Sequence, residues 1–189
     1  SLYNLFQATL NPGDEIIIPA PYWASYPDMT ILAGAVPVIV ETTVDEKYKM
    51  NPAKLDKAIS DKTRMIILNS PSNPSGSNYS KEELDSLAKV LVKHPNIVVV
   101  TDDIYEHILW GDSEFNNILN VSSELYNRTI VVNGVSKAYA MTGWRLGWII
   151  VPLGYVETAE MLAQNLFISA PSIAQFAALK AFSKEATEI

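Results

Sequence analysis

The stretch from Arg64 to Asp102, RMIILNSPSNPSGSNYSKEELDSLAKVLVKHPNIVVVTD, is the part of the sequence that decides the predicted fold. It contains two runs of consecutive apolar residues, MIIL at Met65–Leu68 and IVVV at Ile97–Val100, which are typical of strands covered on both faces. Between them, Ser80 and Glu83 form an S-x-x-E capping box, which marks the start of a helix. A strand, a helix and a second strand in this order indicate one unit of an α/β sheet.

Outward from this stretch, short β-rich runs alternate with amphipathic segments. The predicted strands are Asp14–Pro19, Val36–Val40, Arg64–Asn69, Ile97–Asp102, Thr129–Asn133 and Leu146–Val151. The predicted helices are Ser25–Leu32, Pro52–Ile59, Ser80–Val92 and Val156–Phe167. This alternation predicts an α/β domain with a central, mostly parallel sheet and helices on both of its faces.

Composition restricts the classes of function. The chain has 189 residues, 48% of them hydrophobic, which suits one domain with a substantial core. Its net charge of -7, without a Lys/Arg stripe, argues against a nucleic-acid partner. It has no cysteine and two distant histidines, so we expect neither a disulfide nor a short metal motif. No apolar run approaches the roughly 20 residues of a membrane helix and no signal peptide opens the chain, so we expect a cytoplasmic protein without a membrane partner.

Both ends of the sequence have helical patterns without a clear start or stop signal. The chain starts with SLYNLF, which is amphipathic and lacks a methionine, and the tail AALKAF at Ala177–Phe182 has no clear stop signal. We therefore interpret the chain as a fragment of a longer protein.

Four polar residues follow predicted strand ends: Asn73, Asp102, Tyr105 and Lys137. A doubly wound sheet can bring such positions together at the edge where ligands bind. Taken singly, each has a plainer interpretation. Lys137 would be an exposed loop lysine, Asp102 a strand-end cap, Tyr105 a half-buried aromatic residue, and Asn73 part of a turn before proline.

The segment SKAYAMTGWRLG at Ser136–Gly147 resembles the S-K-x-x-x-M-T-G-W-R-L-G signature of class I aminotransferases, which are fold-type-I pyridoxal-phosphate (PLP) enzymes. Three further segments resemble this family in the same order: PYW at Pro21–Trp23, NPSG at Asn73–Gly76 and DDIY at Asp102–Tyr105. The longer run PYWASYP, at Pro21–Pro27, is most similar to bacterial aspartate aminotransferases.

The resemblance implies a fold and an activity. The chain would be the central part of the PLP-binding large domain, with Leu146–Val151 as an antiparallel strand, and an amino-terminal segment and a carboxyl-terminal small domain would lie outside it. Relatives are homodimers that transfer an amino group from an amino acid to a 2-oxo acid, here aspartate and 2-oxoglutarate. The alternatives are an aromatic, prephenate or alanine aminotransferase, a PLP lyase, or the ligand-sensing domain of a transcription regulator.

The resemblance also assigns the reactive residues. Lys137 matches the lysine that binds the cofactor aldehyde as an imine and later moves the substrate proton, which requires an amine that can be neutral. Asp102 matches the carboxylate that pairs with the pyridine nitrogen and keeps it protonated. The D-x-x-Y spacing to Tyr105 selects Asp102 over Asp103, which we expect to cap a segment or face solvent.

The remaining matches concern binding of the cofactor. Tyr105 and Asn73 match the two residues that hydrogen-bond its phenolic oxygen. Arg145 and Ser136 match residues that bind its phosphate, and Trp23 matches the aromatic residue that stacks on its ring.

Three features of the family site have no counterpart in the sequence. Many relatives have a second serine three residues before the lysine, where this chain has Gly134. The family's glycine-rich phosphate segment would precede Ser1, and the arginine that binds the substrate carboxylate would follow Ile189. Substrate preference is therefore left open by the sequence.

Overall fold

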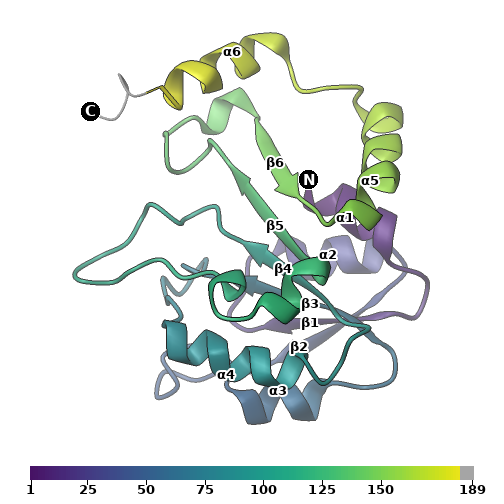
Figure 1. Cartoon of the computed structure of the whole chain (residues 1–189), viewed down its shortest axis with the longest axis vertical. Coiled ribbons are helices and arrows are strands. Elements are labelled where there is room, and N and C mark those ends of the chain that lie inside the picture. The colour runs from purple at the N-terminus through teal and green to yellow at the C-terminus, as the bar shows by residue number, and fades with distance from the viewer. Residues whose placement is uncertain (184–189) are drawn as a thin grey trace.

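The computed structural model describes residues 1–183. Its six strands are β1 (Glu15–Pro19), β2 (Val36–Val40), β3 (Thr63–Asn69), β4 (Val98–Asp102), β5 (Thr129–Gly134) and β6 (Gly147–Ile150). They form one sheet in the order β2-β1-β3-β4-β5-β6 (Figure 1). All neighbouring pairs are parallel except β5 and β6, which are antiparallel. The predicted mixed, mostly parallel sheet is confirmed, including the direction of its last strand.

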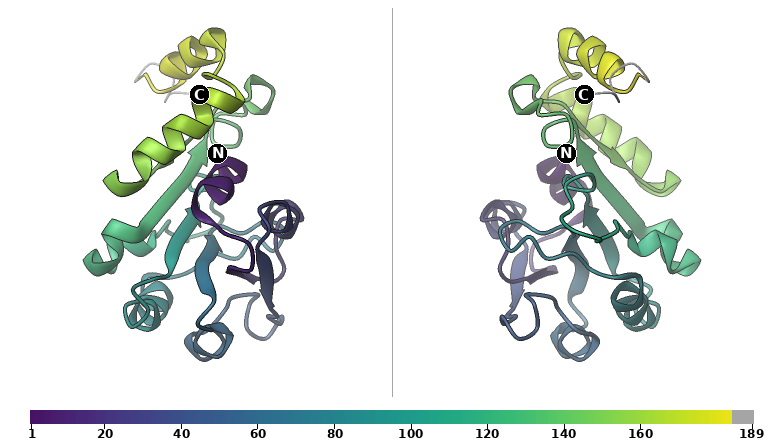
Figure 2. Two further views of the ribbon diagram at one scale, coloured as in Figure 1. Left: turned by 90° about the vertical axis from the view of Figure 1, so that its right-hand side faces the viewer. Right: turned by 90° about the vertical axis from the view of Figure 1, so that its left-hand side faces the viewer.

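Helices cover both faces of this sheet (Figures 1 and 2). They are α1 (Leu2–Thr9), α2 (Ser25–Leu32), α3 (Pro52–Ala58), α4 (Lys81–Leu91), α5 (Leu153–Leu166) and α6 (Ser172–Ala181). Three short 3-10 helices, η1 (Ile118–Asn120), η2 (Ser123–Arg128) and η3 (Thr142–Trp144), were not predicted. None of the helices within residues 1–183 combines the length and the apolar character needed to cross a bilayer.

Two apolar cores lie on opposite faces of the sheet because successive strand residues point in opposite directions. Ile16 and Ile18 pack on the face covered by α1 and α2, whereas Ile17 packs on the face covered by α3 and α4. In the same way, Met65 points to the first core and Ile66 to the second. Both neighbouring positions are buried, so the runs of consecutive apolar residues follow from a sheet with two covered faces.

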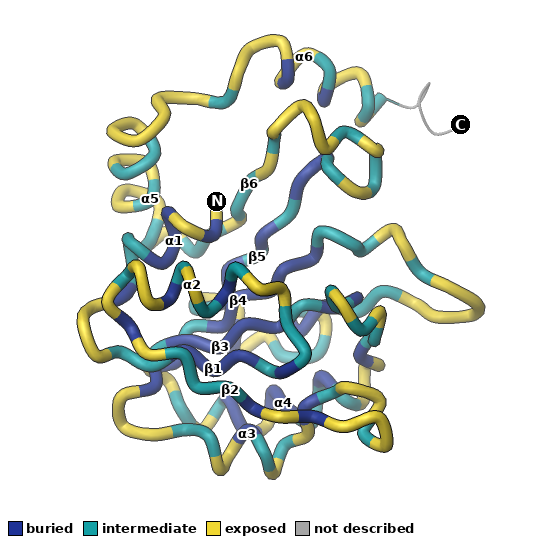
Figure 3. The backbone as a smooth tube through the Cα atoms, turned by 180° about the vertical axis from the view of Figure 1, so that it is seen from behind, coloured by how far each residue is buried: buried dark blue, intermediate teal, exposed yellow. Residues whose placement is uncertain are grey.

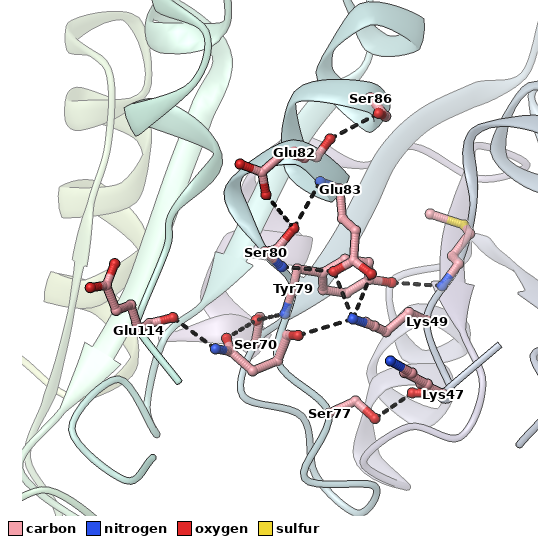
Figure 4. A network of polar contacts seen from close by, with 12 residues as sticks. Lys47, Lys49, Ser70, Ser77, Tyr79, Ser80, Glu82, Glu83, Ser86 and Glu114 are labelled. Carbon is pink, nitrogen blue, oxygen red and sulfur yellow. Dashed lines mark hydrogen bonds and ion pairs between the residues drawn. The ribbon is translucent and has the colours of Figure 1, made fainter. Parts of the chain in front are cut away.

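A polar network joins the start of α4 to the segment between β2 and α3 (Figure 4). The Ser80 hydroxyl accepts from the Glu83 N–H at 3.3 Å, and the Glu83 carboxylate accepts from the Ser80 N–H at 2.7 Å, which confirms the capping box. The same carboxylate pairs with Lys49 Nζ at 2.6 Å. The Tyr79 hydroxyl accepts from the Met50 N–H at 2.7 Å. These contacts fix the segment before α3 against α4.

The last two helices, α5 and α6, are the most exposed helices of the described chain (Figure 3). Leu153 of α5 and Phe176 of α6 are exposed large apolar side chains, as are several of their neighbours. Tyr155 packs against the core on the α1 face, and Phe182 contacts the rings of Tyr139 and Trp148. Only part of the apolar surface of these helices is therefore covered within residues 1–183.

Candidate active site

A cavity of about 480 Å³ lies at the carboxyl ends of β3, β4 and β5. This is the edge at which open α/β sheets bind ligands. The cavity is lined by residues from six separate parts of the chain, and all seven predicted site residues are among them: Trp23, Asn73, Asp102, Tyr105, Ser136, Lys137 and Arg145. The first three residues of the chain also line it, so the amino-terminal end of α1 faces the same space.

Asp102 is the last residue of β4, which places its side chain at the cavity, and it is only 6% exposed. The Tyr26 hydroxyl donates to Asp102 Oδ2 at 2.7 Å, and the Ile104 N–H donates to Oδ1 at 3.4 Å. Burial raises the pKa of the Asp102 carboxyl above its ordinary value, while these two hydrogen bonds act in the opposite direction. The cavity is therefore lined by a carboxyl group that is shielded from water and accepts two hydrogen bonds.

Lys137 lies in the turn that follows β5, where the Ala140 N–H donates to its carbonyl oxygen at 3.1 Å. Its Nζ lies 5.8 Å from the centroid of the Tyr105 ring. The Lys137 residue is exposed, so burial within the described residues does not remove its amine from water. The geometry presents this amine to the cavity beside an aromatic ring.

The turn after Lys137 brings two further polar groups to the cavity. The Thr142 hydroxyl donates to the Ser136 carbonyl oxygen at 2.9 Å. Arg145 has a left-handed backbone conformation, with φ of 54°, and its Nη1 donates to the Thr142 carbonyl oxygen at 3.0 Å. Non-glycine residues adopt this conformation uncommonly. At Arg145 this conformation ends η3 and returns the chain to β6, and Arg145 lines the cavity.

Asn69, the last residue of β3, holds the loop that carries Asn73. Its Nδ2 donates to the Asp102 carbonyl oxygen at 2.8 Å, and its Oδ1 accepts from the Asn73 N–H at 2.7 Å. The predicted turn at Asn73 is present and continues to Gly76, whose φ is 70°. Asn69 thus connects two strand ends to the predicted site residue. It was treated only as the end of a strand in the sequence.

Trp23 and Tyr26 form one aromatic unit at the start of α2. Their rings meet edge to face with centroids 5.4 Å apart, and the Tyr26 N–H donates to the Trp23 carbonyl oxygen at 3.0 Å. Trp23 is 40% exposed and lines the cavity, whereas Tyr26 is 2% exposed. Sequence reasoning found Trp23 through its motif. It missed Tyr26, which lies in the same PYWASYP run.

A family model described as aminotransferase class I and II matches residues 1–189. The chain belongs to this aminotransferase family. It is 53% identical over 178 residues to the aspartate/prephenate aminotransferase of Nitrosomonas europaea, covering 94% of this chain and 45% of that protein. It is 48% identical over 182 residues to the probable aspartate/prephenate aminotransferase of Rhizobium leguminosarum, covering 96% of this chain and 46% of that protein.

The fold is that of solved aminotransferases. The aspartate aminotransferase of Rhizobium meliloti superposes with a TM-score of 0.94 at 40% sequence identity, over 99% of this chain and 48% of that one. The predicted family and fold are therefore confirmed. The chain spans about half the length of the curated aminotransferases that it matches.

Gly134 occupies the position where many aminotransferases have a serine, and the structure gives a physical reason for the difference. A Cβ atom at residue 134 would lie 2.9 Å from the Leu146 carbonyl oxygen and 3.1 Å from the Gly147 Cα. Both are backbone atoms next to or within β6, which cannot move away as a flexible side chain could. A side chain at residue 134 would therefore require the backbone at the start of β6 to shift.

The expectation for Asp103 was wrong. This residue of the aminotransferase D-x-x-Y motif is 5% exposed, and Asn117 Nδ2 donates to its Oδ2 at 2.6 Å. Thr101 Oγ1 lies 3.4 Å from the same oxygen. Burial raises the pKa of the Asp103 carboxyl to about 7, and the nearby Asp102 and Glu106 carboxylates act in the same direction. Asp103 belongs to a buried polar cluster beside the cavity.

This pKa predicts a pH-dependent contribution to stability. The folded chain retains a proton on Asp103 that the unfolded chain releases, because the pKa rises from 3.8 to about 7 on folding. The contribution of Asp103 to the free energy of unfolding should therefore fall as the pH rises from about 4 to 7, by on the order of a few kcal/mol. We expect Asp103→Asn to be more stable than the wild type above pH 7, with the difference shrinking toward pH 4.

Urea unfolding of the wild type and Asp103→Asn at pH 4.5, 6 and 8 measures this difference. The substitution keeps an oxygen that can accept from Asn117, so it changes the charge and little of the shape. A difference in unfolding free energy that is the same at all three pH values would contradict the prediction.

Proposed function

We propose that the protein is a PLP-dependent aminotransferase that moves the amino group of aspartate to 2-oxoglutarate, and that this chain is the central part of its cofactor-binding domain. The observation that carries the proposal is the single cavity that a lysine, a buried aspartate and an arginine line together. These residues are Lys137, which follows β5, Asp102, which ends β4, and Arg145, which precedes β6. Membership of the aminotransferase family supports the same activity.

The residues around the cavity fit the cofactor by size and chemistry. A volume of about 480 Å³ lies within the range of small-molecule sites. When bound, PLP supplies an aldehyde that captures the amino group and a protonated ring that accepts electrons from the substrate. The cavity offers an amine for the aldehyde, a carboxyl for the ring nitrogen, and a guanidinium for the phosphate. The end of α1 adds the positive end of a helix dipole on the same side.

Two side chains carry the reaction in this proposal. The Lys137 amine would hold the cofactor aldehyde and, once the substrate has displaced it, would act as the base that takes the proton from the substrate Cα. The Asp102 carboxylate holds the proton on the ring nitrogen, which keeps the ring electron-poor. Exclusion of water from Asp102 strengthens this charge interaction.

The other five residues bind and tune the cofactor. Asn73 and Tyr105 donate hydrogen bonds to the phenolic oxygen and favour its anionic form. Ser136 and Arg145 bind the phosphate, with about 1.5–3 kcal/mol for each charge-assisted hydrogen bond. Trp23, whose ring is fixed edge to face against Tyr26, offers a flat apolar surface to the cofactor ring.

A second amino acceptor is favoured by the relatives. The Nitrosomonas europaea protein, at 53% identity, is named an aspartate/prephenate aminotransferase, and so is the Rhizobium leguminosarum protein with the word probable. We therefore propose prephenate as an alternative acceptor to 2-oxoglutarate. A direct comparison of kcat/KM for the two acceptors, with aspartate as the donor, decides between them.

The test of the proposed function is an assay of the complete protein that contains this chain. After saturation with PLP, we expect transamination of aspartate with 2-oxoglutarate or prephenate. The 189-residue chain alone should be at least tenfold slower, because positioning supplies much of an enzyme's advantage over its free cofactor. Absence of turnover with both acceptors in the complete protein would reject the function. Turnover by the chain alone within tenfold of the complete protein would reject our view that it is only part of the site.

A homodimer and a cytoplasmic location are also predictions. The exposed apolar side chains of α5 and α6 are compatible with burial against another subunit or domain. Sedimentation of the complete protein tests the first prediction and cell fractionation tests the second.

A further inference from the structure

Tyr26 joins α2 to the end of β4 through a single buried contact. Its hydroxyl donates to Asp102 Oδ2 at 2.7 Å, across 76 residues of sequence. Its ring is 2% exposed and packs in the core on the α1 and α2 face, with the edge-to-face contact to Trp23 on one side. Both the ring and the hydroxyl are therefore held in one place.

The surroundings of this contact keep the proton on the Tyr26 hydroxyl rather than on the Asp102 carboxylate. Burial, followed by the neighbouring Asp102 carboxylate, raises the pKa of the Tyr26 hydroxyl well above its ordinary value, so it stays a donor at neutral pH. Tyr3, Tyr105, Lys137 and Arg145 are the other ionisable side chains that line the same cavity. The adjacent carboxyl of Asp103 accepts from Asn117 instead.

A carboxylate has about four acceptor positions, and Tyr26 occupies one of them on Oδ2. A hydrogen bond to the charged form stabilises that form, so this contact opposes the effect of burial on Asp102. It also restricts rotation of the carboxyl group, which preserves its orientation toward the cavity. The Ile104 N–H takes a second position, on Oδ1 at 3.4 Å, which leaves about two acceptor positions for a ligand N–H.

We propose that Tyr26 is a positioning residue for Asp102: its buried hydroxyl orients the carboxylate and keeps it ionised to pair with the ring nitrogen of the cofactor. The inference rests on the proposed function, in which Asp102 has this role. Tyr26 itself does not touch the reacting atoms. It acts through the carboxylate that it holds.

The test replaces Tyr26 by phenylalanine, which removes the hydroxyl and keeps the ring. The matched control is Tyr79→Phe, because Tyr79 is a second buried tyrosine whose hydroxyl makes a hydrogen bond, on the opposite face of the sheet. In cofactor-free protein labelled with 13C at the aspartate carboxyls, the Asp102 signal is assigned with Asp102→Asn and titrated by NMR. We expect the pKa of Asp102 to rise in Tyr26→Phe and to stay at its wild-type value in Tyr79→Phe.

In the PLP-saturated complete protein, kcat of Tyr26→Phe should fall about tenfold, the size of one hydrogen bond to a charged group, with KM for aspartate little changed. Thermal unfolding of both variants separates this effect from loss of structure. An Asp102 titration that is the same in the wild type and Tyr26→Phe, or that shifts equally in Tyr79→Phe, overturns the inference. The titration uses no cofactor, so it judges the Tyr26 contact even where the complete protein fails the transamination assay.

Discussion

Replacement of Lys137 by alanine is expected to lower kcat for transamination by about 10²- to 10⁴-fold, the contribution of a positioned proton-transfer group. Lys137 presents the amine that lines the cavity beside Tyr105, and in our proposal it both binds the cofactor aldehyde and carries the substrate proton. Lys137→Arg should be impaired to a similar extent. Arginine keeps the positive charge but stays protonated, so it cannot act as a neutral amine.

Borohydride reduction of the PLP-saturated wild type followed by peptide mapping tests the covalent role directly. The pyridoxyl label should be found on Lys137 and be lost in both variants. Lys89→Ala is the matched control, since Lys89 lies on α4 and pairs with Asp85 at 2.6 Å, away from the cavity lining. A label on another lysine, or full activity of Lys137→Arg, would exclude the proposed role.

The sequence predicted the layers of the fold because the physical cause is local. Consecutive apolar residues such as Ile16, Ile17 and Ile18 each face one of two cores, so a sheet covered on both faces leaves an unbroken apolar run. The ends of α2 and β2 agree with the prediction, and the other ends differ by at most three residues, where helices and strands fray. The short 3-10 helices have no comparable periodic signal.

The predicted site residues were found through sequence motifs. Residues to which the motifs assign no role, such as Tyr26, were missed. Tyr26 contacts Asp102 across 76 residues, and a tyrosine within a helical segment is indistinguishable from an ordinary core residue in sequence. Asp103 was expected to cap a segment or face solvent, because the D-x-x-Y spacing selects Asp102 for the cofactor. Its partner, Asn117, lies 14 residues further on in an irregular segment that no pattern connects to β4.

Replacement of Asp102 is the second change with a large expected effect. Asp102→Asn keeps the side-chain shape and an oxygen that can accept from Tyr26, but it removes the negative charge. In our proposal this charge holds the proton on the ring nitrogen, and its loss from a buried position should lower kcat by about 100-fold or more at PLP saturation. Asp102→Ala should lose at least as much activity, and it also leaves the buried Tyr26 hydroxyl without its acceptor, which costs about 1–3 kcal/mol of stability.

Asp103→Asn is the matched control. It removes a neighbouring buried carboxylate and leaves Asp102, the proposed partner of the cofactor ring nitrogen, in place. Both carboxyls are buried at the end of β4, yet their hydrogen bonds lead in different directions, Asp102 to Tyr26 and Asp103 to Asn117. Steady-state kinetics at verified PLP saturation should therefore show a large loss of kcat in Asp102→Asn and a change of less than tenfold in Asp103→Asn. The reverse order would mean that the register of the D-x-x-Y motif is wrong by one residue. Wild-type turnover in Asp102→Asn would mean that the reaction does not use a carboxylate at the ring nitrogen.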